Sequence, residues 1–98
     1  VEHFGFEYTG YVKVPKDDVY AFFTDSDDGS SLYINDKLIV DNDGLHGLTQ
    51  KRGIIALAAG YHKIRVCYFE KTGGDDLKVY IEGKKMKKRL IPSEFLFH

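Results

Sequence analysis

Hydrophobic and polar residues alternate within short stretches along this chain, and Gly, Asp and Asn separate the stretches. A period of two places successive side chains on opposite faces of a strand, so the pattern predicts half-buried β-strands. The residue types agree, because Val, Ile, Tyr and Phe all favour strands. We therefore expect strands over residues 4–14, 19–24, 32–34, 37–40, 54–57, 61–70 and 77–82.

Turn signals mark the ends of several predicted strands. Pro15 cannot donate to a ladder and should end the first strand. Asn35 and Asp36 both tolerate a positive φ, which predicts a two-residue hairpin. Gly10 interrupts the alternation and predicts a bulge or a close approach of another segment. Residues 56–59 have helical propensity but are too few to form a helix without caps, so the chain is predicted to be all-β.

Strands of this number and spacing are typical of an antiparallel β-sandwich or a closed barrel. At 98 residues the chain forms one domain with one core. The parity of the strands predicts which side chains fill that core. The predicted core residues are Phe22, Leu32, Ile34, Val40, Leu57, Ile64, Val66, Tyr68, Leu77, Val79 and Ile81.

Charge and composition exclude some classes of protein. A net charge of −1 argues against a basic nucleic-acid-binding domain. No apolar run approaches the roughly 20 residues of a transmembrane helix, so no membrane insertion is expected. The basic run at residues 84–89 is interpreted as a solvated turn, with contact to an anionic polymer as the alternative. Cys67 is the only cysteine, so no intrachain disulfide forms, and a buried thiol is expected.

The acidic residues are unevenly distributed, because eight of the ten Asp lie between Asp17 and Asp43. The pair Asp27-Asp28, followed by Gly29, lies between two apolar runs, where packing gives no reason for carboxylates. Close-set oxygen ligands on such a loop bind hard cations such as calcium, or accept hydrogen bonds from sugar hydroxyls. A polar turn that binds nothing remains the alternative, since the same residues favour turns.

A second acidic segment follows the next predicted hairpin. We expect it to lie at the same end of the sandwich as Asp27 and Asp28, because both segments leave strands of one local hairpin. The predicted ligand-binding residues therefore include members of both segments. They are Asp27, Asp28, Gly29, Asp41, Asn42, Asp43 and His46, with Asp27 and Asp28 as the metal ligands.

No arrangement of residues in the sequence indicates catalysis. Nucleophile elbows, phosphate-binding glycine loops and His/Cys spacings for zinc are absent from the sequence. Paired carboxylates suggest glycoside hydrolysis, but its general acid needs an apolar cleft, and an Asp-rich turn is exposed to water. His62 lies on a predicted strand and is interpreted as structural. We therefore expect no catalytic residues and no enzyme activity in this chain.

Four blocks of sequence, in the same order, resemble the PA14 domain family, the β-sandwich module of anthrax protective antigen. The first two blocks are residues 8–15, YTGYVKVP, and residues 20–42, YAFFTDSDDGSSLYINDKLIVDN. The other two are residues 57–66, LAAGYHKIRV, and residues 68–74, YFEKTGG. The resemblance extends over nearly the whole chain and implies a lectin-like β-sandwich.

The resemblance implies a module of secreted bacterial proteins, found outside the cytoplasm: secreted, periplasmic or on the cell surface. In fungal adhesin lectins of the family an adjacent Asp-Asp pair binds calcium, which binds vicinal sugar hydroxyls, and Asp27 and Asp28 stand at that pair. The version attached to bacterial glycoside hydrolases, of the β-N-acetylhexosaminidase or β-glucosidase type, looks most similar. The function implied is therefore a non-catalytic carbohydrate-binding accessory module that binds a glycan or oligosaccharide.

Two further expectations concern the parent protein. The chain starts at Val1 without an initiator Met, so residues 1–98 are expected to be a single domain cut from a longer protein, without the first strands of the full domain. The alternative function is a structural module that packs on the catalytic domain of the parent chain without binding sugar. That alternative predicts an exposed apolar patch, formed by Phe4, Phe95 and Phe97.

Overall fold

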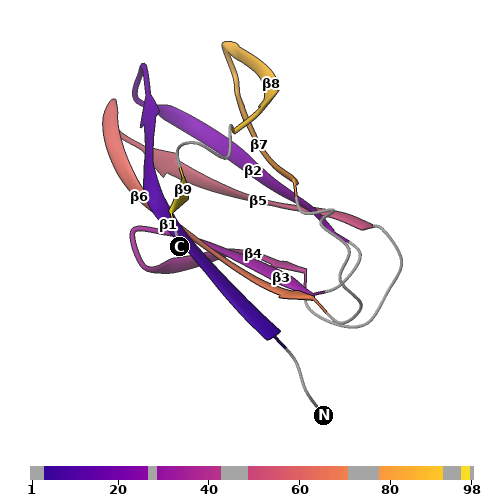
Figure 1. Cartoon of the computed structure of the whole chain (residues 1–98). Helices are drawn as coiled ribbons and strands as arrows, with labels where there is room; N and C mark the ends of the chain where they lie inside the picture. Colours follow the sequence, from indigo (N-terminus) through magenta and orange to yellow (C-terminus); the bar gives the residue numbers. More distant parts are fainter. Residues whose placement is uncertain (1–3, 27–28, 43–48, 71–77, 92–95, 98) are drawn as a thin grey trace.

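Two antiparallel sheets pack face to face in the computed structural model of the chain, which describes residues 4–26, 29–42, 49–70, 78–91 and 96–97. Figure 1 shows the two layers, and the all-β sandwich predicted from the sequence is confirmed. The order is β4-β3-β6-β1-β9 in the first sheet (sheet A) and β5-β2-β7-β8 in the second (sheet B). The strands are β1 (Phe4–Val14), β2 (Asp18–Ser26), β3 (Ser30–Ile34), β4 (Lys37–Asn42), β5 (Thr49–Leu57), β6 (Gly60–Glu70), β7 (Lys78–Gly83), β8 (Met86–Leu90) and β9 (Leu96–Phe97).

The core between the sheets follows the predicted parity. Every predicted core residue that the structure describes is buried; Leu77 lies outside the described residues. The inward-facing stripes also contribute Val12, Val14 and Tyr20, and Ile91 covers the core after β8. Among the described residues, none belongs to a helix that could cross a bilayer.

The structure corrects the prediction for the basic run and decides between the two alternatives for Gly10. Residues 86–90 of the basic run are not a solvated turn but form β8, the edge strand of sheet B. Gly10 makes no bulge, because β1 and β6 pair in one unbroken register from Phe4 to Val14. Gly10 is instead buried and pairs with Leu96, where β9 joins the sheet. An irregularity occurs in the β3–β4 pair, where the register shifts between Leu32 and Tyr33.

The Cys67 thiol is also not buried as predicted, because it is only half-buried on the outer face of sheet A. It lies 3.7 Å from Nη1 of Arg65, which forms a 3.0 Å ion pair with Glu7. The hydrogen bond to Glu7 raises the pKa of the Arg65 guanidinium above its ordinary value. The same guanidinium carbon lies 4.1 Å from the centre of the Tyr33 ring, so a cation covers this part of the face.

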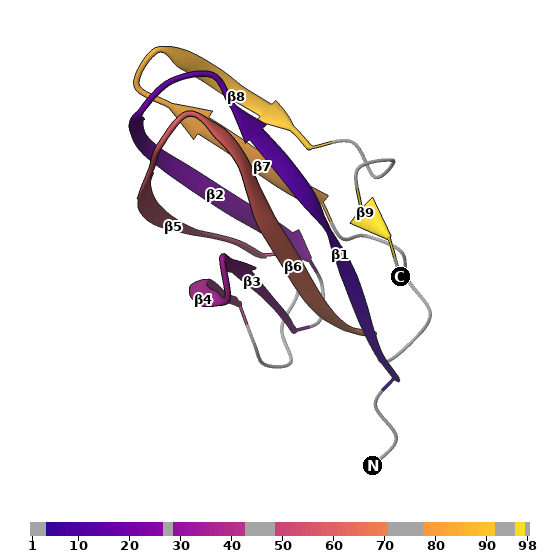
Figure 2. The same ribbon diagram turned by 90° about the vertical axis from the view of Figure 1, so that its left-hand side faces the viewer.

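Four connections between strands lie together at one end of the sandwich, called the hairpin end (Figures 1 and 2). They are at residues 15–17, 35–36, 58–59 and 84–85. Asn35 and Asp36 form the predicted hairpin, with φ of 50° and 69°. The backbone N–H of Ala59 donates to Oδ1 of Asp17 at 2.7 Å, and that of Lys84 donates to Oδ2 of Asp18 at 3.2 Å. The first hydrogen bond joins the two connections that pass between the sheets, and the second lies within sheet B.

Candidate functional site

The acidic end is the opposite end of the sandwich, defined by the strand ends at Asp25, Ser26, Ser30 and Asn42. The register brings these ends together, because Ser30 of β3 pairs with Asn42 of β4. The flanking residues of the two acidic segments therefore lie at one end, as the sequence predicted.

Three of the predicted site residues are described at this end. Gly29 is buried, the side chain of Asp41 is exposed, and Asn42 is 1% exposed. The remaining members of the predicted site lie outside the described residues, so their mutual geometry stays a prediction. They are Asp27, Asp28, Asp43 and His46.

A buried polar cluster lies between the sheets at the acidic end, formed by Thr24 of β2, Ser30 of β3 and Asn42 of β4. All three are at most 1% exposed. The Ser30 hydroxyl donates to Oγ1 of Thr24 at 3.2 Å, and the Asn42 side-chain amide donates to the same oxygen at 3.5 Å. Thr24 therefore joins sheet B to the two strands of sheet A that lead into the acidic segments.

Sequence reasoning missed Thr24 and Ser30 as part of this end, although the alternation contains a signal for them. Thr24 continues the inward stripe of Tyr20 and Phe22, and Ser30 has the same parity as Leu32. Polar side chains in phase with a core stripe must find hydrogen-bond partners, because unpaired burial is costly. Such residues at strand ends predict a buried polar cluster.

Chemically, this end fixes backbone positions and offers no reaction centre within the part of the chain that is described. No group of three or more His, Cys, Asp or Glu there is arranged to hold a metal ion. Asp25 is half-buried at the end of β2, where it pairs with Gln50 of β5 and Lys78 of β7. The hydrogen bonds of the buried polar cluster therefore fix the spacing of the strand ends that flank the acidic segments.

Replacing Thr24 with Val is expected to lower the free energy of unfolding by about 1–3 kcal/mol, because the shape is kept while two buried donors lose their shared acceptor. Urea denaturation measures the change. Thr9→Val, at a half-buried position of β1, is the control and should stay within about 0.5 kcal/mol. Equal midpoints for Thr24→Val and the parent chain would show that the cluster does not stabilise the fold.

His62 lies at the hairpin end and has the structural role expected from the sequence. Its Nε2 lies 2.7 Å from the carbonyl oxygen of Ala58, and its Nδ1 lies 2.9 Å from the side-chain amide nitrogen of Asn35. Since a carbonyl only accepts, this pattern assigns the proton to Nε2. The ring thus connects the 35–36 hairpin to the segment before β6.

The relatives of the chain agree with this architecture. Anti-sigma-I factor RsgI3 of Acetivibrio thermocellus is 29% identical over 91 residues, which are 92% of this chain and 14% of that protein. The solved structure of an anti-sigma factor domain-containing protein from Clostridium clariflavum superposes with a TM-score of 0.82 at 28% identity, over 95% of this chain and 32% of that one. The chain thus spans a small part of each of these relatives.

A solved PA14 sugar-binding domain from an RTX adhesin superposes with a TM-score of 0.76 at 20% identity, over 94% of this chain and 52% of that one, and this likeness shows the fold alone. The model of the PA14 domain family matches residues 1–94. With nearly the whole sequence matched and the same sandwich formed, the chain belongs to the PA14 domain family.

Proposed function

We propose that the chain is a non-catalytic carbohydrate-binding module that binds a glycan at the acidic end. The single observation that carries the proposal is membership of the PA14 family, matched over residues 1–94. The proposed ligand-binding residues are those predicted from the sequence: Asp27, Asp28, Gly29, Asp41, Asn42, Asp43 and His46. Asp27 and Asp28 are the proposed calcium ligands.

Electrostatics supports a cation at this end. Adjacent carboxylates repel each other, so an ion or a set of N–H donors must stabilise the pair when both are charged. Calcium takes oxygen ligands from carboxylates, amide carbonyls and water. In this proposal, sugar hydroxyls take the place of water. The buried cluster of Thr24, Ser30 and Asn42 supports the same proposal. It holds the ends of β2, β3 and β4 in place, which reduces the conformational entropy lost when a ligand binds.

The names of the relatives support a more specific role in the parent protein. RsgI3 and the Clostridium clariflavum protein are both named for anti-sigma factors, and neither name describes a glycoside hydrolase. We therefore favour an anti-sigma factor-type parent, in which this module lies outside the cytoplasm and senses a glycan. An accessory module of a glycoside hydrolase is the second prediction for the parent.

Calcium binding and glycan binding are expected to depend on Asp27. Titration of the chain with calcium in a calorimeter should give heat above dilution, and a glycan array should show binding that is lost when calcium is chelated. Asp27→Asn should abolish both, because it removes a charged ligand. Asp36→Asn is the matched control at the hairpin end, where Asp36 forms only an exposed ion pair with Lys63, and it should bind like the parent chain.

The outcomes separate the alternatives. If the parent chain gives no heat at millimolar calcium but still binds glycans, the metal is absent and the glycan site stands. If neither ligand binds, the carbohydrate-binding proposal fails and the structural-module alternative is favoured. The apolar patch expected for that alternative involves the side chains of Phe4, Phe95 and Phe97, which lie outside the described ones.

The two parents are distinguished in the full-length protein. A sensing module should make the activity of the associated sigma factor depend on glycan added outside the cell, and Asp27→Asn should remove that dependence. In a hydrolase, deletion of the module should lower activity on a polysaccharide and leave activity on a small soluble substrate unchanged. If the activity of the sigma factor changes neither with added glycan nor with Asp27→Asn, the anti-sigma factor-type parent is contradicted.

A further inference from the structure

A concave surface lies at the hairpin end, beside the edge of β1 and facing β8. It is an open groove of about 730 Å³, a size within the range of small-ligand sites. Val12, Ile81 and Ile91 contribute buried apolar surface to it. Residues of both β1 and β8 line it, and Figure 2 shows these two strands extending to the same end of the sandwich. The groove is remote from the acidic end and from the described residues of the proposed glycan site, Gly29, Asp41 and Asn42.

Exposed rings distinguish this groove from an ordinary sheet edge. Tyr11 of β1 is 64% exposed and Tyr61 of β6 is 70% exposed, and both line the groove together with Leu90, which is 49% exposed. Tyr11 pairs with Lys63 in the β1–β6 register, so Tyr61 is its diagonal neighbour on the same face. Diagonal neighbours lie roughly 7–8 Å apart, within reach of aromatic side chains. Two adjacent flat rings form a platform for a flat, partly apolar ligand.

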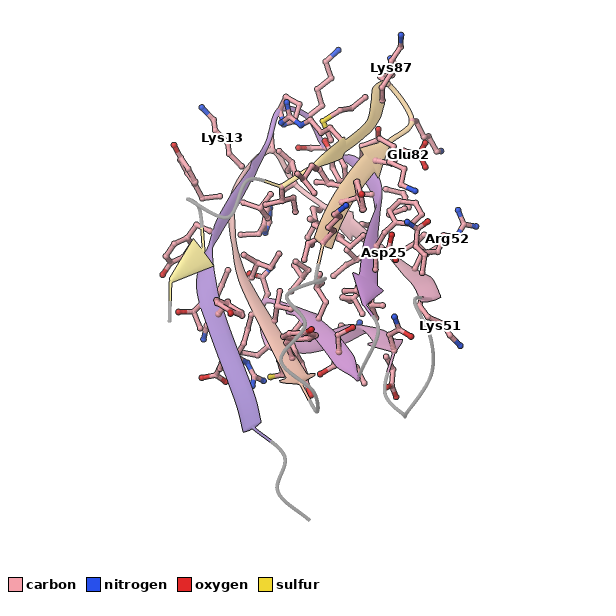
Figure 3. All side chains as sticks on the ribbon, turned by 45° about the vertical axis from the view of Figure 1, so that its right-hand side comes forward. Lys13, Asp25, Lys51, Arg52, Glu82 and Lys87 are labelled. Atoms are coloured by element: carbon pink, nitrogen blue, oxygen red, sulfur yellow. The ribbon has the colours of Figure 1, made fainter. Side chains whose placement is uncertain are left out.

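The charged side chains of the groove are all cationic. Lys13 and Arg89 line it, and no Asp or Glu does among the described residues. Neither cation forms an ion pair with a described carboxylate, and the ammonium of Lys13 lies 5.6 Å from the centre of the Tyr61 ring. Figure 3 shows Lys13 projecting from β1 at the same end as Lys87 of β8. An anion placed here would gain two partners without breaking an ion pair among the described residues.

We propose that this groove is a second carbohydrate site, which binds an oligosaccharide that carries carboxylates, such as a hexuronic acid chain. The apolar face of a pyranose ring packs on Tyr11 or Tyr61, and its carboxylate accepts hydrogen bonds from Lys13 or Arg89. The guanidinium of Arg89 presents paired donors that match a carboxylate geometrically. The site is independent of calcium and of the acidic end.

The observations favour a sugar over an acidic peptide as the occupant. A peptide would need a long row of unpaired backbone groups to add a strand, and β9 already pairs with β1 at Thr9 and Gly10. That pairing leaves only residues 11–14 of β1 open, and the edge of β8 beside the groove is five residues long. The exposed tyrosines and cations lie beside these short edges. The ligand must therefore be recognised through rings and charges more than through strand addition.

The test compares a hexuronic acid tetrasaccharide with its carboxyl-reduced, neutral counterpart by calorimetry in the presence of a calcium chelator. We expect the acidic ligand to bind at least about tenfold more tightly, with an affinity that falls as salt is added. Arg89→Gln should reduce the affinity for the acidic ligand about tenfold and remove the preference over the neutral one. Tyr61→Ala should weaken both ligands, because it removes the shared stacking surface.

Lys87→Gln is the matched control, since Lys87 is an exposed cation of β8 that does not line the groove. It should bind like the parent chain, and the urea midpoint of each variant should show that the exposed substitutions leave folding intact. Equal affinity for the acidic and neutral ligands would overturn the proposal, as would an equal loss in Lys87→Gln. Equally tight binding of an acidic peptide of the same charge would also overturn it.

One further variant separates this site from the proposed function. Binding of the acidic ligand should survive Asp27→Asn, because the groove and the acidic end are at opposite ends. Loss of that binding in Asp27→Asn would place the ligand at the acidic end and contradict the second site. Conversely, if the parent chain shows no calcium-dependent glycan binding, the proposed function fails, but the expected binding of the acidic oligosaccharide in the groove is unaffected.

Discussion

Replacing Phe22 with Ala is expected to lower the free energy of unfolding by about 3–5 kcal/mol, the range for a buried Phe reduced to a methyl group. Phe22 is 0% exposed in the centre of β2, which pairs with β5 on one side and β7 on the other. The ring packs within the single core, so its removal leaves a cavity between the two sheets. Such a loss is a large part of the 5–15 kcal/mol that stabilises a typical domain.

Urea denaturation followed by circular dichroism measures this loss. Ile54→Ala is the matched control, because Ile54 pairs with the neighbouring Ala21 but is 63% exposed on the outer face of sheet B. The control should change the free energy of unfolding by no more than about 0.5 kcal/mol. A loss below about 1 kcal/mol for Phe22→Ala would mean that the core collapses around the missing ring or is packed differently.

Replacing Gly53 with Ala is expected to cost about 3 kcal/mol, although it adds only one methyl group. A Cβ on Gly53 of β5 would overlap with the carbonyl oxygen of Ile39 and lie 2.7 Å from its carbonyl carbon. Those atoms belong to the backbone of β4, so no side-chain rotation relieves the clash. The edges of the two sheets must move apart instead, which places the cost at the upper end of the range for overpacking.

Two substitutions provide the comparison for Gly53→Ala. Ala56→Val adds more volume on the same strand at an exposed position, and it should be tolerated within about 0.5 kcal/mol. Gly83→Ala meets the ring of Tyr20 at 2.9 Å, which is a side chain and not the backbone of another strand, so a smaller loss is expected. If Gly53→Ala proves as stable as Ala56→Val, the close approach of β4 and β5 is wrong.

The sequence by itself determined most of the strands, their inward faces and one turn. Phe22, Leu32 and Ile64 could be placed in the core because alternation is a local property, readable two residues at a time. The Asn35-Asp36 hairpin was equally local, since the positive φ values depend on those two residues. Of the predicted site, Gly29, Asp41 and Asn42 were placed at the end where they were expected.

Only the tertiary structure decided which strands became neighbours, and several features depend on that choice. The sequence of residues 86–90 predicted a charged turn, but these residues pair with the free edge of β7 and form β8. Thr24 forms hydrogen bonds with Ser30 and Asn42 only because β2 packs across β3 and β4. Tyr11, Tyr61 and Arg89 are far apart in the sequence and line one groove through the position of β1 between β6 and β9. Alternation states which face a side chain occupies but not what lies beside it, because strand order results from the packing of the whole chain.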